Sequence, residues 1–275
     1  MNSNRIAILG TGSMGGAILH GLIASGIEAA DISVSTKSEA SAATLREELG
    51  VSAYSLETNA DANRAAVSGA HTVIVGVKPG YVLEVLDEVA DSLSEDALVI
   101  SVAAGITTAA MEATVSNPVV RAMPNTPSVV GRGVTGIAKG SRATGEDLAT
   151  ATKVFESVGK VLVIEESQID ALSTISGSGP AYVFFLIEQF TATAVSMGFT
   201  GEQAEVMVHD TFLGASELLA ASGKSPEELR RQVTSPNGTT MRAIAVLEEA
   251  NLKATFDKAT AAALARAKEI AEGNL

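Results

Sequence analysis

The chain has 275 residues, of which 46% are hydrophobic and 19% are charged, a composition typical of folded globular proteins rather than disordered ones. Its net charge of −13 repels nucleic acid phosphates and anionic membranes, so we expect neither as a partner. Cysteine is absent, which excludes disulfides, thiolate catalysis and cysteine-based metal sites. The first apolar run is too short for the core of a secretory signal, and we expect a cytoplasmic enzyme.

Short β-rich runs alternate with helical patterns up to about residue 165. Strands are predicted at 5–10, 31–36, 51–54, 72–77, 97–102, 119–122, 134–139 and 161–164, and helices at 13–26, 39–49, 60–67 and 81–93. Because continuously apolar strands alternate with helices, we expect a parallel sheet that is covered on both faces. The N-terminal part is therefore predicted to be an α/β, Rossmann-like doubly wound sheet.

The remaining chain has helical patterns and no convincing strand alternation. Helices are predicted at 168–175, 181–197, 201–221, 226–232, 241–250 and 252–272. This predicts two domains, a dinucleotide-binding domain over 1–165 and an all-α domain over 166–275. The segment 181–195 is apolar around nearly its whole circumference, with Glu188 as its only charge. A domain of this size cannot easily bury such a helix alone, so we expect an obligate homodimer formed through residues 180–222.

A glycine-rich turn lies between the first predicted strand and the first predicted helix. Gly10, Gly12 and Gly15 form the pattern GxGxxG in this strand–turn–helix context. Gly10 allows the tight turn, Gly12 lets a pyrophosphate approach the backbone, and Gly15 lets helix and strand pack closely. The pattern predicts dinucleotide binding at the helix N-terminus, and the alternative is a tight turn without a ligand.

The end of the second predicted strand indicates which nucleotide binds. It reads Ser35-Thr36-Lys37, whereas NAD enzymes usually place an acid there for the ribose hydroxyls. The nearest acids are Asp31, at the wrong end of the strand, and Glu39, inside the next helix. Hydroxyls and one cation suit a 2′-phosphate better than a diol. NADPH is therefore the expected cofactor, with NADH left open, and the alternative is an ordinary polar loop.

Five further segments have unusual residues at strand or helix ends. In open α/β sheets, ligands bind beyond the carboxyl ends of strands, and glycines and prolines at helix starts allow close approach. The alternative to ligand binding is a purely structural role for each segment: a strand-to-helix turn for the first two, a plain loop for the third, and helix capping for the last two. The segments are Val77-Lys78-Pro79 with Ala103-Ala104-Gly105, the motif 121–127 with Asn125 and Thr126, the motif 176–182, and the motif 235–240.

The histidines do not point to a metal site. His20, His71 and His209 lie in different segments, and no HExxH motif is present. We therefore expect no metal.

Taken in order, five motifs resemble one enzyme family. They are GTGSMGGA, VKPG, RAMPNTP, ISGSGPAY and VTSPNGTT followed by MRAIAVLEE, and together they are similar to the pyrroline-5-carboxylate reductase family over essentially the whole chain. The resemblance implies a Rossmann domain and a helical domain whose helices interleave with those of a partner subunit, with a larger homo-oligomer left open. It also implies reduction of 1-pyrroline-5-carboxylate to proline with NADPH or NADH.

The resemblance also implies the site residues. Its cofactor positions fall on Gly10, Thr11, Gly12, Ser13, Met14, Gly15, Ser35, Thr36, Asn59, Gly76, Val77, Lys78, Pro79, Ala103, Ala104 and Gly105, to which Lys37 is added from its charge. Its substrate positions fall on Glu166, Ser235, Gly238, Thr239 and Thr240. The implied reaction is hydride transfer to a cyclic iminium, so no strong general acid is needed, and the Thr240 hydroxyl is the expected catalytic hydrogen-bonding group.

Two other functions are alternatives to this reading of the sequence. A β-hydroxyacid dehydrogenase also pairs a Rossmann domain with a helical one, but that family uses a lysine shortly after a similar glycine-rich turn. No lysine lies between Lys160 and Lys224 in this chain. A non-enzymatic NADP sensor would not explain the proline-containing motifs at 121–127, 176–182 and 235–240.

Overall fold

The computed structural model describes residues 5–271, and side-chain exposure within the range 5–269. The last residue of the predicted helix 252–272 lies outside these ranges. The chain divides into two compact units, which are described separately. Unit 1 comprises the chain up to Ser178 together with the part from Leu264 onward, and unit 2 comprises Gly179–Ala263.

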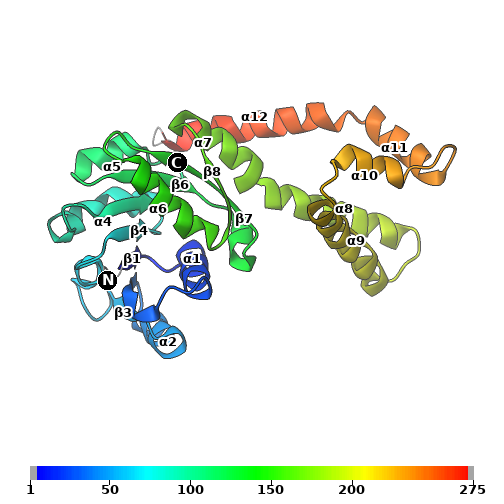
Figure 1. Ribbon diagram of the computed structural model, residues 1–275. Coiled ribbons are helices and arrows are strands. Elements are labelled where there is room, and N and C mark those ends of the chain that lie inside the picture. Colours follow the sequence, from blue (N-terminus) through cyan, green and yellow to red (C-terminus); the bar gives the residue numbers. More distant parts are fainter. Residues whose placement is uncertain (1–4, 272–275) are drawn as a thin grey trace. The chain divides into compact units, whose positions relative to one another are not determined.

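Unit 1 is built on an eight-stranded sheet in the order β3-β2-β1-β4-β5-β6-β7-β8 (Figure 1). Pairs among the first six strands are parallel, as are β7 and β8, as predicted for a doubly wound fold. The strands are β1 (Ile6–Leu9), β2 (Ile32–Thr36), β3 (Ser52–Ser55), β4 (Thr72–Val75), β5 (Leu98–Ser101), β6 (Val119–Met123), β7 (Gly133–Lys139) and β8 (Gly159–Val163).

One strand pair differs from the expected parallel sheet, because β7 runs antiparallel to β6. The connection between them contains a short 3₁₀ turn (Thr126–Val130) and no α-helix. A parallel pair needs a long crossover, whereas an antiparallel pair can be joined by a short loop. The prediction of a parallel sheet is therefore wrong for this pair.

Hydrophobic cores cover both faces of the sheet because side chains alternate along each strand. In β1, Ile6 and Ile8 belong to the core that includes Ile18 of α1, whereas Ala7 and Leu9 belong to the core on the other face. The helices are α1 (Ser13–Ala24), α2 (Glu39–Leu49), α3 (Ala62–Val67), α4 (Val82–Val89), α5 (Thr108–Thr114), α6 (Gly145–Glu156) and α7 (Glu166–Leu172). Of these, α5 and α6 were not predicted.

Unit 1 extends beyond the predicted domain boundary at residue 165. Helix α7 packs on β6 and β7, with Ile169 fully buried. It continues into a π-helical turn (Ser173–Gly177), where the Ser178 N–H donates to the Ser173 carbonyl at 2.8 Å. The division between the compact units follows this turn.

Unit 2 consists of helices, as predicted. They are α8 (Gly179–Ser196), α9 (Gly201–Ser222), α10 (Pro226–Gln232), α11 (Thr239–Glu249) and the first part of α12 (Leu252–Ala271). Capping boxes define two helix starts, with Thr200 and Gln203 at α9 and Ser225 and Glu228 at α10. Helix α8 packs on α9, and the ring of Tyr182 lies 6.3 Å from that of Phe256 in α12.

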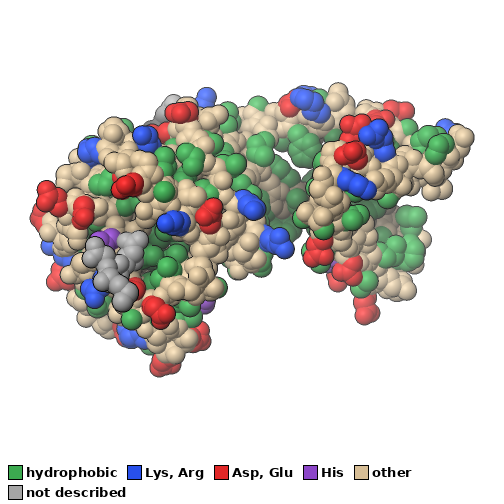
Figure 2. All heavy atoms as spheres, in the orientation of Figure 1, with side chains coloured by type: hydrophobic (Ala, Val, Ile, Leu, Met, Phe, Trp, Pro, Cys, Tyr) green, Lys and Arg blue, Asp and Glu red, His purple; other side chains and the backbone are tan. Residues whose placement is uncertain are grey.

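Large apolar side chains remain on the surface of unit 2, where Figure 2 shows them in green. On α8, Phe184 is 66% exposed and Phe190 is 53% exposed, and Ala194 is the only buried residue of that helix. A single chain therefore does not bury this helix, in line with the expectation that the domain cannot surround it alone. Within residues 5–271, no helix is long and apolar enough to cross a membrane.

Candidate cofactor and substrate sites

The predicted cofactor residues of unit 1 follow the carboxyl ends of neighbouring parallel strands. Backbone hydrogen bonds connect these ends. The Gly10 N–H donates to the Ser35 carbonyl at 3.1 Å, the Gly76 N–H to the Leu9 carbonyl at 2.8 Å, and the Val102 N–H to the Val75 carbonyl at 3.2 Å. The turns after β1, β2, β4 and β5 are thus held together at one edge of the sheet, where ligands of open α/β sheets bind.

The glycine turn is packed so tightly that it tolerates almost no side chain. Gly10 has a φ of +87°, which favours glycine. A Cβ on Gly15 would overlap the Gly10 carbonyl oxygen, and one on Gly76 would lie 2.7 Å from the same oxygen. Gly12 differs from both, because a Cβ there would meet nothing within 4 Å.

Helix α1 begins at this open position with its first N–H groups uncapped. Its N-cap residue Gly12 makes no side-chain capping bond, and no acid lies in the first turn. Orphan N–H groups and the positive end of the helix dipole favour a phosphate. These residues therefore fit the pyrophosphate of a dinucleotide.

The end of β2 offers a cation but no free hydroxyl pair. Ser35 and Thr36 are buried, and the Thr36 hydroxyl donates to the Ser38 carbonyl at 2.8 Å, whereas Lys37 is exposed. The nearby acid Glu39 bonds to Arg46 and accepts from the Thr58 hydroxyl, and these hydrogen bonds hold the pKa of Glu39 below its usual value.

Sequence reasoning missed a second acid near this loop. One carboxylate oxygen of Glu57 accepts the Glu39 N–H at the start of α2, at 2.8 Å. Glu57 follows β3, so only the sheet order β3-β2-β1 could have pointed to it.

The other predicted cofactor residues lie in turns after β3, β4 and β5. Asn59 accepts the Asp61 N–H at 3.0 Å within its turn, and Lys78 is exposed before the 3₁₀ turn Pro79–Tyr81. Ala104 is exposed, in the turn of residues 103–105. These turns leave backbone and side-chain groups open to a ligand.

Glu166 opens α7 and already has partners within unit 1. Its Oε1 accepts the Thr108 N–H at 2.7 Å, and its Oε2 accepts the Thr108 hydroxyl at 2.6 Å. The Arg121 Nη1 lies 3.7 Å from Oε1, and its Nη2 lies 2.6 Å from Asp170 Oδ1. No motif or spacing in the sequence pointed to Thr108 or Asp170 as partners of this group.

Asn125 of the motif 121–127 has a structural role in the fold. It is buried, its Nδ2 donates to the Ser176 carbonyl at 2.8 Å, and its Oδ1 accepts the Val134 N–H at 2.8 Å. It thereby connects the end of β6 to the π-helical turn. Thr126, by contrast, is exposed.

The other predicted substrate residues lie in unit 2, at the start of α11. The preceding loop places Asn237 at a φ of +62°, and the Gly238 N–H donates to the Ser235 carbonyl at 3.0 Å. A Cβ on Gly238 would overlap Ser235 Oγ, so a side chain there would disturb the loop. Gly238 caps α11 without a side-chain bond, and Thr239 and Thr240 are exposed. The first N–H groups of α11 are thus open to an anion.

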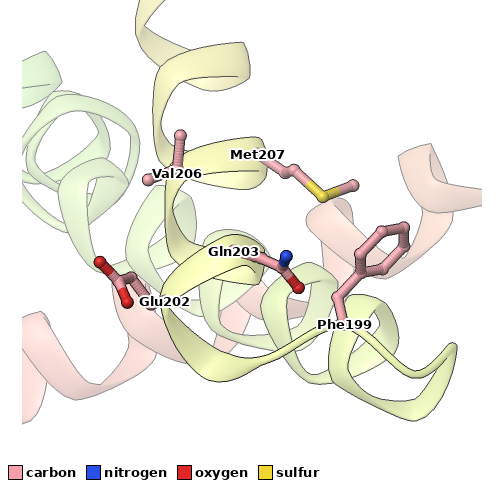
Figure 3. A pocket seen from close by; sticks show the side chains of 5 residues that line it. All are labelled: Phe199, Glu202, Gln203, Val206 and Met207. Atoms are coloured by element: carbon pink, nitrogen blue, oxygen red, sulfur yellow. The ribbon is translucent and has the colours of Figure 1, made fainter.

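Two surface hollows lie outside the glycine turn. One of about 360 Å³ is lined by Phe199 and by residues of α9, with Val206 and Met207 giving it an apolar wall (Figure 3). It contains none of the predicted site residues. Another, of about 250 Å³, is lined by Glu166 together with Lys139, Leu148, Val163, Ile164, Glu165 and Gln168.

Comparison with known proteins agrees with this arrangement. Residues 166–270 match the family model described as pyrroline-5-carboxylate reductase dimerisation, and residues 5–105 match one described as NADP oxidoreductase, coenzyme F420-dependent. Among curated relatives, the pyrroline-5-carboxylate reductase of Corynebacterium melassecola is 38% identical, covering 96% of this chain and 98% of its own. That of Escherichia coli (strain K12) is 34% identical, covering 98% of each chain.

Solved structures give the same result. A pyrroline-5-carboxylate reductase from Coxiella burnetii is 39% identical and superposes with a TM-score of 0.91 over 98% of each chain. The Plasmodium falciparum enzyme, whose structure has NADP bound, is 27% identical with a TM-score of 0.82, over 98% of this chain and 99% of its own. The fold, the motifs and these similarities over nearly the whole length show that the chain belongs to the pyrroline-5-carboxylate reductase family.

Proposed function

We propose that this protein reduces 1-pyrroline-5-carboxylate to L-proline with NAD(P)H, the last step of proline biosynthesis. The observation that carries the proposal is the open face of Gly12 beside the uncapped start of α1. It provides a dinucleotide cradle in a chain that is similar over nearly its whole length to these reductases.

The cofactor-binding residues proposed are those of the turns at one sheet edge. The first N–H groups of α1 would bind the pyrophosphate, and the turns after β4 and β5, residues 76–79 and 103–105, would hold the nicotinamide end. When bound, NAD(P)H supplies the hydride. These turns would hold the hydride donor in one orientation, and positioning of reactants can remove about 7–11 kcal/mol of barrier.

NADPH is the proposed nucleotide, with NADH also accepted. The exposed Lys37 offers a charge to a 2′-phosphate, and the nearby Glu39 is engaged by Arg46 and Thr58. A ribose diol would therefore find no free acid at Glu39. Glu57 is likewise engaged at the same loop, where its carboxylate accepts the Glu39 N–H.

The substrate is proposed to bind at the start of α11. The N–H groups of Thr239 and Thr240, with the Ser235 and Gly238 loop, suit the single carboxylate of pyrroline-5-carboxylate. The Thr240 hydroxyl would hydrogen-bond to the ring nitrogen. Because the protonated imine is already an electrophile, no strong acid is needed. The Thr240 hydroxyl oxygen would only have to accept a hydrogen bond from the N–H of the protonated ring. Glu166 is proposed as a further substrate-site residue.

The assembly proposed is a homodimer formed through residues 180–222, with a larger homo-oligomer left open. The exposed apolar side chains of α8 and α9 and the match to the dimerisation model support self-association. Light scattering at micromolar concentration should give the mass of a dimer or a multiple of it, and a stable, active monomer would contradict the proposal. A cytoplasmic location stays a prediction from the sequence.

The experiment that tests the activity is direct. Purified protein is mixed with NADPH or NADH and pyrroline-5-carboxylate, and nucleotide oxidation is followed by the loss of its near-ultraviolet absorbance. Oxidation that depends on the imine, with proline as the product, is the expected result. A parallel reaction with NADP⁺ and a β-hydroxyacid tests the dehydrogenase alternative, and turnover only in that reaction would overturn the proposal.

A further inference from the structure

The turn of residues 103–105 is anchored on the side of β5 by hydrogen bonds at its start. The Val102 N–H donates to the Val75 carbonyl at 3.2 Å, and the Ala103 N–H donates to the Ser101 hydroxyl oxygen at 3.3 Å. Ser101 is fully buried, so this anchor belongs to the core of the sheet. Backbone and buried groups thus fix the first half of the turn.

On the other side, the turn is anchored only a few residues later, at Thr108. Both polar groups of Thr108, its N–H and its hydroxyl, donate to the Glu166 carboxylate at 2.7 and 2.6 Å. Hydrogen bonds to a charged acceptor are shorter and stronger than those between neutral groups. Because only Ile106 and Thr107 separate Gly105 from Thr108, a shift of Thr108 displaces the turn.

Arg121 holds Glu166 in place from within the sheet. Its side chain is 4% exposed, and its two terminal nitrogens face Glu166 at 3.7 Å and Asp170 at 2.6 Å, both on α7. Its Nε is buried without a hydrogen-bond partner. The two carboxylates of α7 are therefore what compensates the buried charge of the guanidinium. A buried charge is strongly unfavourable unless it is paired, which fixes the first turn of α7 and its Glu166 side chain.

We propose that Arg121, Glu166 and Thr108 form a positioning chain that sets the turn of residues 103–105 against the nicotinamide end of the cofactor. The inference rests on the proposed function, because it takes this turn to bind the nucleotide. It assigns a positioning role to Thr108 and Arg121, with Asp170 as the second ionic partner of Arg121. None of these three is among the predicted site residues. The adenine end, at the glycine turn and Lys37, is held by other contacts and is independent of the chain.

The test compares two ligands on one set of variants. Thr108→Val keeps the shape of the buried side chain and removes its hydroxyl donor. We expect its Kd for NADPH to rise by about 3- to 10-fold, because the lost bond lies within the protein and only part of its free energy reaches the nucleotide, and we expect kcat to fall as well. The Kd for adenosine 2′,5′-bisphosphate, which has the adenine end and no nicotinamide, should be unchanged. Thr108→Ser keeps the hydroxyl and should restore NADPH binding.

Glu112 provides a matched control on the same helix. Its carboxylate also accepts one hydroxyl, from Ser141 at 2.7 Å, and one backbone N–H, from Arg142 at 2.9 Å. It lies towards the opposite end of α5 from Thr108. Glu112→Gln should bind both ligands as the wild type does, whereas Glu166→Gln should behave like Thr108→Val.

Three results would overturn the positioning chain. They are unchanged NADPH binding in Thr108→Val, equal weakening of both ligands, or an effect confined to the KM for pyrroline-5-carboxylate. Wild-type protein that binds neither ligand would overturn the proposed function and this chain with it. Normal binding by the wild type and by Thr108→Val would overturn the chain alone.

Discussion

Gly12→Ala separates cofactor binding from folding at the glycine turn. A methyl group at this position meets no protein atom within 4 Å, and the backbone, with φ −69° and ψ −162°, is accessible to alanine. Alanine is a poorer N-cap than glycine but reduces the entropy of the unfolded chain, and the two effects oppose each other. The free energy of unfolding should therefore change by less than about 1 kcal/mol.

The same methyl group occupies the space that a pyrophosphate needs to reach the first N–H groups of α1. Losing a hydrogen bond to a charged group weakens binding by about 1.5–3 kcal/mol, which corresponds to about a 10- to 150-fold higher Kd for NADPH. Calorimetric titration with NADPH and a thermal melt on the same preparation measure both quantities.

Gly16→Ala is the matched control, one turn further along α1. Its Cβ would lie 3.8 Å from the Thr11 carbonyl oxygen, which is ordinary contact, and alanine favours the helix by about 0.5–1 kcal/mol. This variant should melt slightly higher and bind NADPH normally. Gly12→Ala that binds NADPH with the wild-type Kd would refute the placement of the pyrophosphate at Gly12.

Three further predictions concern other residues. Lys37→Glu should raise the KM for NADPH far more than that for NADH, by about 10-fold or more from one charge-assisted contact, and an equal effect on both nucleotides would make Lys37 an ordinary surface residue. Thr240→Ala should lower kcat/KM for pyrroline-5-carboxylate by about 10- to 100-fold without a change in nucleotide affinity, whereas a lower melting temperature with normal kinetics would mean that Thr240 serves only the helix. Burial raises the pKa of Glu112, but hydrogen bonds from the Arg142 N–H and the Ser141 hydroxyl outweigh this and bring the pKa below its usual value. The ionised Glu112 carboxylate therefore stabilises the fold at neutral pH. The melting temperature of Glu112→Gln should be lower than that of the wild type near pH 7, and this difference should shrink as the pH falls through the lowered pKa of Glu112. A difference in melting temperature that stays constant with pH would contradict this.

The sheet and most helices could be predicted because local patterns and core burial agree there. Strand β1 is apolar at every position since both faces of the sheet are covered, and α2 and α10 have the predicted bounds, each with a serine N-cap. Helix α5 was missed because its seven residues are too few to show a helical period. Helix α6 was missed although Thr144 and Asp147 form a capping box at its start, a signal that the sequence prediction did not use. The direction of β7 depends on how the chain turns after β6, which strand composition does not encode.

The sequence pattern and the contacts within the fold divide the chain at different residues. The change from strand to helix patterns near residue 165 coincides with the start of the dimerisation model at residue 166. The compact unit continues to Ser178 because α7 is held to the sheet through Arg121 and Asp170. Contacts between residues so far apart in sequence leave no periodic signal.

The candidate cofactor site was more predictable than the contacts around it. The glycine spacing predicted the tight turn at which Gly10 and Gly15 pack, since close backbone approach demands glycine. Gly76, which packs against the same turn, was expected only from the family resemblance. The partners of Glu166 could not be predicted, because Thr108 comes from a helix that was itself missed. Burial of Thr36 likewise depends on β3 beside β2, a neighbour that the local sequence does not reveal.

Transfer of label from the cofactor tests the proposed reaction most directly. The protein is incubated with pyrroline-5-carboxylate and NADPH that carries deuterium at both nicotinamide C4 positions, and the proline formed is analysed by mass spectrometry. Hydride transfer to the imine carbon predicts proline that contains a single deuterium, formed in a one-to-one ratio with oxidised nucleotide. Proline without deuterium, or nucleotide binding without any proline, would contradict it.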